Sequence, residues 1–449
     1  MGLQTHRIGQ PELEKVKEAV RAMRGGPRAL QLYMDICAKC GTCAKQCHVS
    51  QTDLNSYANP AMRSDRLRKL YREDRSLLRK VLRAAGLTNG NGLTADTLEE
   101  WARDFYSCSG CRRCAKFCPL GIDNSVITRK ARSILHSIGL TPGKMSATQE
   151  AADRFGNGEG VTPPTAIEMI GFLEGELLAE YGVPIRIPID RKADVLFVTA
   201  TGEILSNPET LMGCAAFFHA AGIDWTMSSH AFDAANFGLF TGDDAHMKRK
   251  NKLLHDASID LGVKKLVIGE CGHAYRVATQ IGGKKYWGKN IPYDIISIFI
   301  MAAEVIRRRG VKLDRTINPM AVTYHDPCNY ARSTGLIEEP REVLRACAGD
   351  LREMTPNRDY NWCCGGGGGL AVLEGSEGVR KMEISFYEYR MTLAGRKKLE
   401  QVDRTGAAYV AAPCGNCKRQ IRQLMEYHNR EVEVGGVFDL LGKAIVLRG

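Results

Sequence analysis

Two runs of four cysteines with the same internal spacing constrain this chain more than any other feature. They are Cys37-x2-Cys40-x2-Cys43-x3-Cys47 and Cys108-x2-Cys111-x2-Cys114-x3-Cys118. The first residues contain no apolar segment of the kind found in secretory signals. A chain without a signal is expected in a reducing compartment, where many cysteines indicate metal or redox chemistry. The two runs are therefore predicted to bind metal.

The spacing of both runs is that of bacterial ferredoxins, whose thiolates hold [4Fe–4S] clusters. The fourth cysteine of each run is too constrained to close the same cube, so it ligates the other cluster. Zinc sites use C-x2-C pairs instead of two identical four-cysteine runs. We therefore predict two cubane clusters, one held by Cys37, Cys40, Cys43 and Cys118, and the other by Cys108, Cys111, Cys114 and Cys47.

The residue after the fourth cysteine differs between the runs. Pro119 follows the second run, whereas His48 follows the first, so the first turn is expected to be looser or differently shaped. We expect His48 to pack in the protein or lie at its surface. The alternative is that His48 tunes a cluster potential or relays protons.

The segment between the two runs indicates a helical ferredoxin domain over residues 1–140. Leu67 and Leu70 begin an apolar pattern of helical spacing, and Thr97 to Tyr106 is predicted as a second helix. This layout resembles the helical ferredoxin domain of succinate dehydrogenase-type iron–sulfur subunits. Nine Lys or Arg against three acids lie between Arg63 and Arg83. They form a solvated face or a docking surface for an acidic partner or anionic lipid.

The second half of the chain is predicted to contain two α/β repeats, over residues 191–315 and 316–449, after a linker over 141–190. A loop is expected from Thr141 to Pro164, which is rich in Gly, Pro, Thr and Ser. Strand-like segments begin at Asp194 and Ala321, and apolar strands alternating with helices imply parallel sheets. Sites in such sheets form beyond the carboxyl ends of strands, where Cys271 and Cys414 are placed.

The second repeat carries the remaining cysteine motif. It contains Cys328, the adjacent pair Cys363-Cys364 followed by five glycines, and Cys414-x2-Cys417. A glycine run lets backbone approach an inorganic cluster and point N–H groups at its sulfurs. It lacks the Gly-Lys-Ser/Thr ending of a phosphate-binding loop. A noncubane cluster is therefore favoured over a nucleotide.

This arrangement resembles the cysteine-rich CCG domain of heterodisulfide reductases, and most of the chain resembles their D-type subunit. The resemblance implies one noncubane [4Fe–4S] cluster, held by Cys328, Cys363, Cys364, Cys414 and Cys417. It also implies a helical insert around Ser385 to Arg396, because the gap before Cys414 is long. The first repeat is degenerate: Phe232 to Gly238 lacks the cysteine pair, and Cys271-Gly272-His273 replaces C-x2-C. Cys214 and Cys347 are expected in packing.

The degenerate first repeat resembles the heterodisulfide reductase-like subunits of membrane redox complexes, of the DsrK, TmcB and HmcF type. That resemblance implies a cytoplasmic subunit attached to the inner face of the membrane through a cytochrome b-like partner, with further redox subunits. It implies an oxidoreductase that reduces or forms a thiol disulfide or trisulfide, such as one on DsrC. The expected proton donors are His325, His273 and Glu270, with Cys271 lining the site.

Two other functions remain open from the sequence. All clusters could relay electrons to another subunit, or the chain could be the iron–sulfur subunit of a glycolate, lactate or glycerol 3-phosphate dehydrogenase. Nucleic acid is not an expected partner despite a net charge of +11, because zinc-finger spacing and aromatic RNA-binding signatures are missing. No run of about 18 apolar residues predicts a membrane span.

Overall fold

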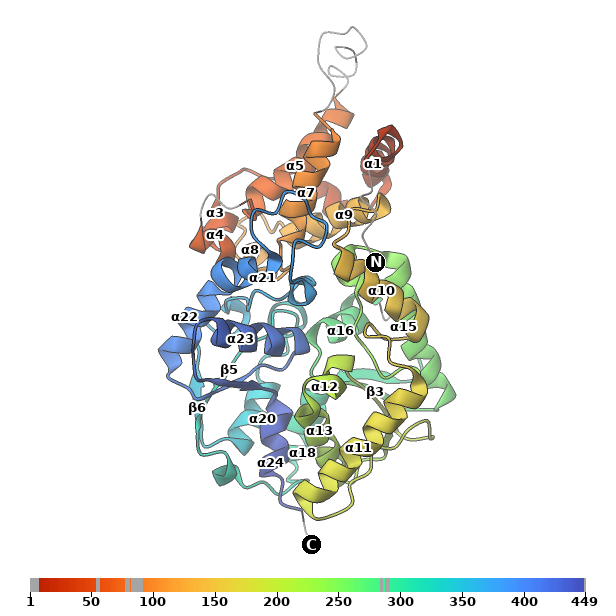
Figure 1. The fold of residues 1–449 in the computed structure, drawn as a ribbon, viewed down its shortest axis with the longest axis vertical. Coiled ribbons are helices and arrows are strands. Elements are labelled where there is room, and N and C mark those ends of the chain that lie inside the picture. The colour runs from red at the N-terminus through yellow and green to blue at the C-terminus, as the bar shows by residue number, and fades with distance from the viewer. Residues whose placement is uncertain are drawn as a thin grey trace. The chain divides into compact units, whose positions relative to one another are not determined.

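The structure, a computed structural model, describes residues 8–53, 57–76, 81, 92–282, 286 and 291–447. Residues 77–80 and 82–83 of the basic stretch lie outside these ranges. The chain forms two compact units (Figure 1). The first unit comprises Met1–Ser146, Gly238–Asp243 and Trp362–Lys397, and the second comprises Ala147–Phe237, Asp244–Asn361 and Lys398–Gly449. The units interleave along the chain, whereas the predicted domains follow one another.

The first unit is helical. Its main helices are α1 (Gln10–Ala22), α2 (Arg28–Asp35), α3 (Thr42–Lys45), α4 (His48–Thr52), α5 (Pro60–Arg75), α7 (Ala95–Tyr106), α8 (Arg113–Lys116), α9 (Asn124–Ser137), α14 (Gly238–Thr241) and α21 (Phe386–Tyr389). Asn59 caps α5 through hydrogen bonds from the N–H groups of Ala61 and Met62, with Pro60 at the first helical position. The predicted helices after Cys47 and before Cys108 are thus confirmed as α5 and α7.

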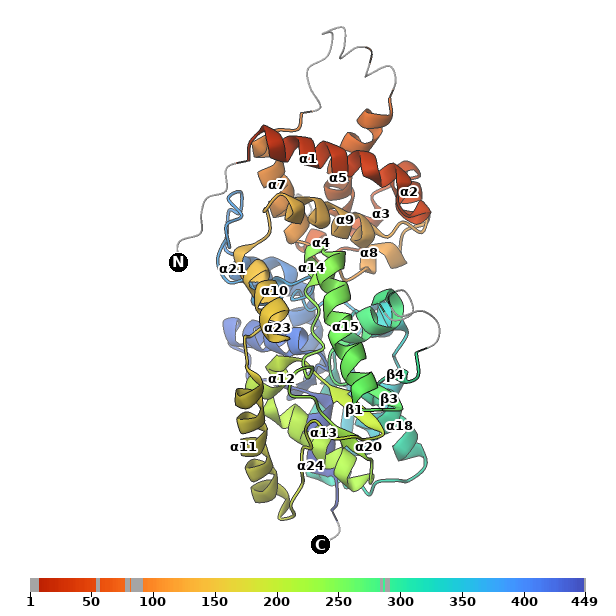
Figure 2. The same cartoon turned by 90° about the vertical axis from the view of Figure 1, so that its right-hand side faces the viewer.

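A single apolar core holds the first unit together. Helix α9 packs against α5 and α7, and α1 lies across α5 and α9 (Figure 2). Leu67, Phe105 and Leu135 are fully buried in this core, together with Leu370 and Phe386 from the later segment of the chain. Burying such side chains contributes about 1.5–3 kcal/mol each. The segment 362–397 is therefore part of the first unit's core.

The second unit contains two parallel four-stranded sheets. The first has the order β2-β1-β3-β4 and the second β6-β5-β7-β8. The strands are β1 (Val195–Val198), β2 (Trp225–Thr226), β3 (Lys265–Ile268), β4 (Asp294–Ser297), β5 (Ala321–Tyr324), β6 (Asp350–Glu353), β7 (Tyr409–Ala411) and β8 (Glu433–Gly435). Each sheet thus follows the same order, in which the first strand lies between the second and the third. The predicted fold class, a helical ferredoxin domain with mixed α/β structure after it, is confirmed.

Four helices join the two sheets of the second unit. They are α13 (Pro208–Ala220), α18 (Ile298–Arg307), α20 (Glu339–Cys347) and α24 (Val437–Ala444). Helix α13 packs against α24, and α18 packs against α20. Since α13 and α20 follow the first strand of their repeats, and α18 and α24 the last, these are the same contact made twice. The repeats therefore associate as two copies related by an approximate two-fold rotation would.

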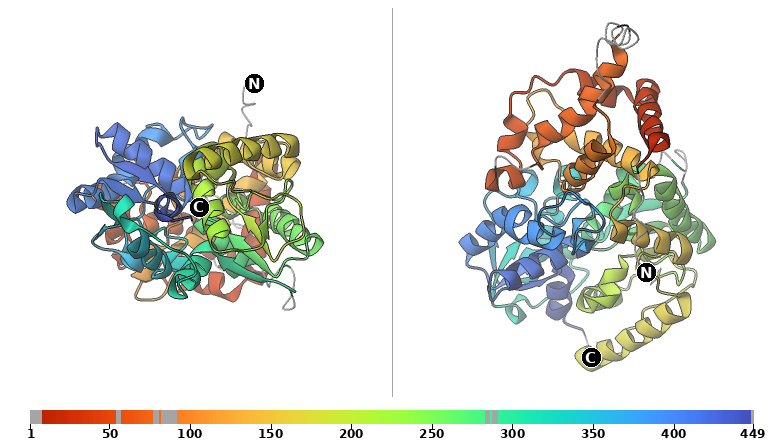
Figure 3. Two further views of the ribbon diagram at one scale, coloured as in Figure 1. Left: turned by 90° about the horizontal axis from the view of Figure 1, so that it is seen from below. Right: turned by 45° about the horizontal axis from the view of Figure 1, so that its top comes forward.

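Two helices depart from the sequence-based expectation or complete it. Helix α10 (Gly143–Phe155) occupies part of the segment expected as a loop, so that expectation was wrong. Its Met145 and Ala152 are buried, and their packing outweighs the local glycines and prolines. The expected insert is helical, as α21 and a π-helix over Arg390–Ala394. Helix α11 (Pro163–Tyr181), yellow in Figure 3, packs against α13.

No helix among the described residues is both long enough and apolar enough to cross a membrane.

Candidate iron–sulfur centres

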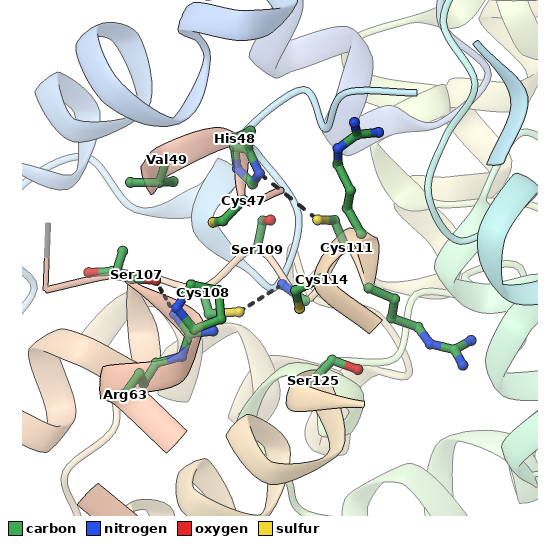
Figure 4. Close-up of a pocket in the computed structure, with 15 residues that line it drawn as sticks. Cys47, His48, Val49, Arg63, Ser107, Cys108, Ser109, Cys111, Cys114 and Ser125 are labelled. Carbon is green, nitrogen blue, oxygen red and sulfur yellow. Dashed lines mark hydrogen bonds between the residues drawn. The ribbon is translucent and has the colours of Figure 1, made fainter. Parts of the chain in front are cut away.

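One cavity of the first unit is lined by cysteines from both runs (Figure 4). Cys108, Cys111 and Cys114 of the second run surround it together with Cys47 of the first. The turn between Cys108 and Cys114 depends on left-handed backbone at Gly110 and Arg112, which leads into α8. The N–H of Gly110 donates a hydrogen bond to Cys108 Sγ at 3.4 Å. Four thiols from two distant segments thus face one space.

A second cavity of the same unit is lined by the other four cysteines. Cys37, Cys40 and Cys43 surround it together with Cys118. Gly41 has left-handed backbone and leads into α3, as Arg112 leads into α8. Cys40 is exposed, whereas Cys111 and Cys114 of the other cavity are buried. This cavity is therefore the one nearer to solvent.

The electrostatics of the buried cavity favour a bound cation. Burial and then the neighbouring Cys111 and Cys108 thiolates raise the pKa of the Cys114 thiol well above its ordinary value. Burial also raises the pKa of Cys47. Such thiols ionise together only when a metal compensates their charge, because like charges at close range repel. A four-thiolate set around one cavity fits the ligands of a cubane cluster.

Arg63 is a buried positive charge beside this cavity. Burial would lower the pKa of its guanidinium, but the Cys108 and Cys47 thiolates raise it overall. Arg63 Nε donates to Thr128 Oγ1 at 3.2 Å, and Nη1 donates to the carbonyl of Ala58. No local pattern singles out this arginine, because its contacts lie on other parts of the chain.

The adjacent cysteines Cys363 and Cys364 are buried in the first unit. Cys363 Sγ donates to Ser109 Oγ at 3.3 Å, and the N–H of Gly365 donates to Cys363 Sγ at 3.4 Å. The glycine run was expected to approach a cluster. A Cβ on Gly367 would instead lie 2.6 Å from the carbonyl oxygen of Ser109. The glycines therefore let this turn pack against the backbone of the second ferredoxin run.

Arg132 fixes that packing from α9. Its guanidinium donates to the carbonyl of Cys108 at 2.6 Å, of Gly368 at 2.7 Å and of Phe240 at 3.0 Å. These three carbonyls belong to three separate chain segments of the first unit. A buried arginine with several carbonyl acceptors satisfies otherwise unpaired backbone groups. Arg132 thus positions the second run and the glycine turn relative to each other.

The second unit places three motif cysteines at the carboxyl ends of its second sheet. Cys328 follows β5, Cys414 caps α23 (Gly415–Tyr427), and Cys417 lies in the first turn of α23. All three are buried. Hydrogen bonds from Cys417 and then His273 lower the pKa of the Cys414 thiol well below its ordinary value. The strand-end position that the sequence predicted for Cys414 is confirmed.

His325 lies next to this group in the second unit. It follows β5, is buried, and one ring nitrogen lies within 4.8 Å of Cys417 Sγ. Asn361 Nδ2 lies 3.4 Å from His325 Nδ1 and donates to the carbonyl of Asp326 at 2.7 Å. Lys398 Nζ donates to Asn361 Oδ1 at 2.8 Å. Asn361 and Lys398 therefore orient the histidine, and sequence reasoning missed both.

The turn of the degenerate repeat keeps a cysteine and a histidine in contact. Cys271 Sγ lies 3.5 Å from His273 Nδ1, and the N–H of Asn236 donates to His273 Nε2 at 3.3 Å. Burial lowers the pKa of His273, but the thiolates of Cys271 and Cys414 raise it overall to about 10. The segment 232–238, which lacks the cysteine pair, thus supplies a backbone donor that holds the ring.

A buried ion network supports both cysteine turns of the second unit. Lys418 Nζ lies 2.6 Å from Glu203 Oε2 and 3.0 Å from Glu270 Oε2, and all three side chains are fully buried. Glu270 also accepts hydrogen bonds from the N–H groups of Val437 and Phe438 at the start of α24. Glu270 was a predicted proton donor, but these contacts give it a structural position.

Two family models match the chain over the segments that carry these cysteines. Residues 33–122 match a 4Fe–4S dicluster domain, and residues 322–422 match a cysteine-rich domain. The Hdr-like menaquinol oxidoreductase iron–sulfur subunit of Archaeoglobus profundus is 30% identical over 94% of this chain and 81% of its own length. The chain belongs to the heterodisulfide reductase-like (Hdr-like) iron–sulfur subunits.

Other relatives of this Hdr-like chain are similar over almost its whole length. Iron–sulfur subunit 2 of the Hdr-like menaquinol oxidoreductase of Archaeoglobus fulgidus is 29% identical over 96% of this chain and 83% of its own length. The D-type polypeptide of the dihydromethanophenazine:CoB–CoM heterodisulfide reductase of Methanosarcina barkeri is 24% identical over 93% and 96%. No solved structure matches. The predicted resemblance is confirmed, and the matched domains indicate iron–sulfur clusters.

Proposed function

We propose that this Hdr-like subunit reduces a thiol disulfide or trisulfide, or forms one in the reverse direction, at its cysteine-rich domain. The complete set of five motif cysteines carries the proposal. All of them lie within the matched residues 322–422, and all are buried. A subunit that only relayed electrons would need no cysteines beyond the two four-thiol sets. The five are Cys328, Cys363, Cys364, Cys414 and Cys417.

The side chains present fit the clusters that this function requires. We propose that Cys37, Cys40, Cys43 and Cys118 hold one cubane, that Cys47, Cys108, Cys111 and Cys114 hold the other, and that the five motif cysteines hold a noncubane cluster. The crowding of thiols around each cavity supports this. When bound, the clusters supply electrons singly to a sulfur substrate, whose disulfide takes up two electrons and two protons to give two thiols.

The proton donors proposed for this reaction are His325 and His273. Asn361 and the N–H of Asn236 fix the two rings, so each presents a defined nitrogen. A histidine delivers protons near neutral pH, and a proton is needed on each sulfur released. Cys271, in contact with His273, is proposed to line the same site.

The partners proposed are a membrane cytochrome b-like subunit, further redox subunits and a thiol protein substrate such as DsrC. The names of the relatives, a menaquinol oxidoreductase and a dihydromethanophenazine-dependent reductase, support a quinol-type electron donor. Cys40 is exposed, which places the Cys37 set where a partner can approach. Lys39 and Lys69 line an open cavity beside that set. We propose peripheral attachment at the cytoplasmic face of the membrane.

The second candidate is an electron relay, including the iron–sulfur subunit of a glycolate, lactate or glycerol 3-phosphate dehydrogenase. The degenerate first repeat favours it, because Cys271 is the single motif thiol that this repeat keeps.

Iron analysis of the native complex with electron paramagnetic resonance (EPR) tests the proposal. Three four-iron clusters predict about 12 Fe per chain, and a thiol substrate should alter the signal of the oxidised noncubane centre. About 8 Fe, with no signal that responds to thiols, would leave only the electron relay.

The crossed ligand sets predict which single substitutions share an effect. Cys47→Ser is expected to remove the same EPR signal as Cys111→Ser, although Cys47 belongs to the other run. Cys118→Ser should in turn match Cys40→Ser, each at a loss of about 4 Fe. Cys214→Ser, at a buried cysteine outside the motifs, serves as the control and should keep all signals. If Cys47→Ser matches Cys40→Ser, the sets are not crossed.

A further inference from the structure

His48 stands between two cysteine sets of the first unit. Its Nδ1 lies 3.9 Å from Cys111 Sγ, the contact drawn dashed in Figure 4. A ring nitrogen of His48, Cys111 Sγ and Cys363 Sγ all lie within 4.8 Å of one another. Cys111 lines the buried four-thiol cavity, and Cys363 belongs to the cysteine-rich motif. The imidazole therefore touches a member of each set.

The surroundings of the ring leave sulfur as its acceptor. His48 is 2% exposed, and its Nε2 has no hydrogen-bond partner among the residues that the structure describes. An imidazole carries at least one N–H, and a buried donor without an acceptor is costly. Cysteine sulfur, more so as a thiolate, can accept that hydrogen bond.

The backbone does not explain why a histidine stands here. His48 is the first residue of α4, a position that suits proline because its N–H lies outside the helical hydrogen-bond ladder. Proline does occupy the equivalent place after the second run, at Pro119. The imidazole thus serves something other than the turn.

We propose that His48 is a positioning residue that couples the two cysteine sets. Its N–H donates to the Cys111 thiolate and raises the reduction potential of the centre held by Cys47, Cys108, Cys111 and Cys114. A hydrogen bond to a ligand sulfur stabilises the reduced state, because the added electron increases the negative charge on sulfur. The ring also bridges Cys111 and Cys363, so one electron can pass between the sets without a proton. This inference rests on the proposed function only in taking these cysteines as ligands.

Redox titration of the native complex by EPR tests this role. His48→Pro and His48→Leu both remove the donor, and proline keeps the helix start. Either is expected to shift the potential of one cubane negatively, equal to about a tenfold change in its ratio of oxidised to reduced form. His48→Gln keeps an N–H donor and should restore most of the shift. Val49→Ala, at a buried neighbour on α4, should leave both cubane potentials unchanged.

Two outcomes would overturn the inference. One is wild-type potentials for both cubanes in His48→Pro and His48→Leu at full iron content. The other is loss of iron from all three His48 variants, which would assign the ring to packing alone. These readouts are potentials and iron content, so they are distinct from the thiol turnover on which the proposed function depends.

Discussion

Serine at both Cys363 and Cys364 is expected to abolish thiol–disulfide turnover while both cubane signals remain. The two thiols are proposed ligands of the noncubane cluster, and oxygen is a poor replacement for thiolate sulfur on iron. Iron content should fall from about 12 to about 8 per chain. Turnover of a disulfide substrate, iron content and EPR of the purified complex measure these effects together.

The matched control is Cys347→Ser, at a buried cysteine on α20 whose Sγ donates to the carbonyl of Leu344. A hydroxyl can make the same hydrogen bond, so full iron and full turnover are expected. If the double serine variant retains turnover, the chemistry lies elsewhere in the complex, and the electron relay is the better description.

Replacement of Lys418 by methionine is expected to destabilise the second unit by about 3–5 kcal/mol, because it leaves buried carboxylates without their cation. Lys418, Glu203 and Glu270 are all fully buried, so solvent does not screen their charges. Lys418 also hydrogen-bonds to Thr210 Oγ1 at 2.6 Å. Thermal and denaturant unfolding of the complete chain measure the loss. Lys264→Met, which removes an exposed ion pair with Asp194 in the same unit, should change stability by under about 0.5 kcal/mol.

The effect of Lys418→Met should depend on pH. Burial raises the pKa of Glu203 to about 7, although Lys418 lowers it. Without Lys418 the folded pKa rises further above the unfolded value, so the carboxyl takes up a proton on folding. Its stability contribution is then largest at low pH and is lost as the pH rises through the folded pKa. The variant should be least stable above about pH 7 and recover toward about pH 5. Equal stability to wild type across this range would show that the network carries no net energy.

The sequence predicted the helical dicluster domain and the two α/β repeats well. The spacing of the cysteine runs is local, and spacing within a few residues limits which metal centres can form. The apolar strands near Val195 and Ala321 stand out because strands covered on both faces are continuously apolar. The strand-end positions of Cys271 and Cys414 follow from the same pattern.

The sequence was a poor guide to contacts between distant residues. Gly367 and Gly368 were assigned to a cluster, yet they pack against the backbone of Ser109 and Cys108. Glu270 was expected to donate protons, yet it pairs with Lys418 and caps α24. Each of these contacts joins residues more than a hundred positions apart, and no local pattern records such pairs.

By itself the sequence determined the number of cysteines, their spacing and the repeated strand order, because these follow from short-range geometry and hydrophobic periodicity. Only the tertiary structure decided which cysteines share a cavity and what surrounds them. It placed Cys47 with Cys108, set the His48 ring between Cys111 and Cys363, and buried Lys418 between two glutamates. Burial and the meeting of distant segments set the charge around each thiol. These long-range terms control the chemistry of an iron–sulfur protein.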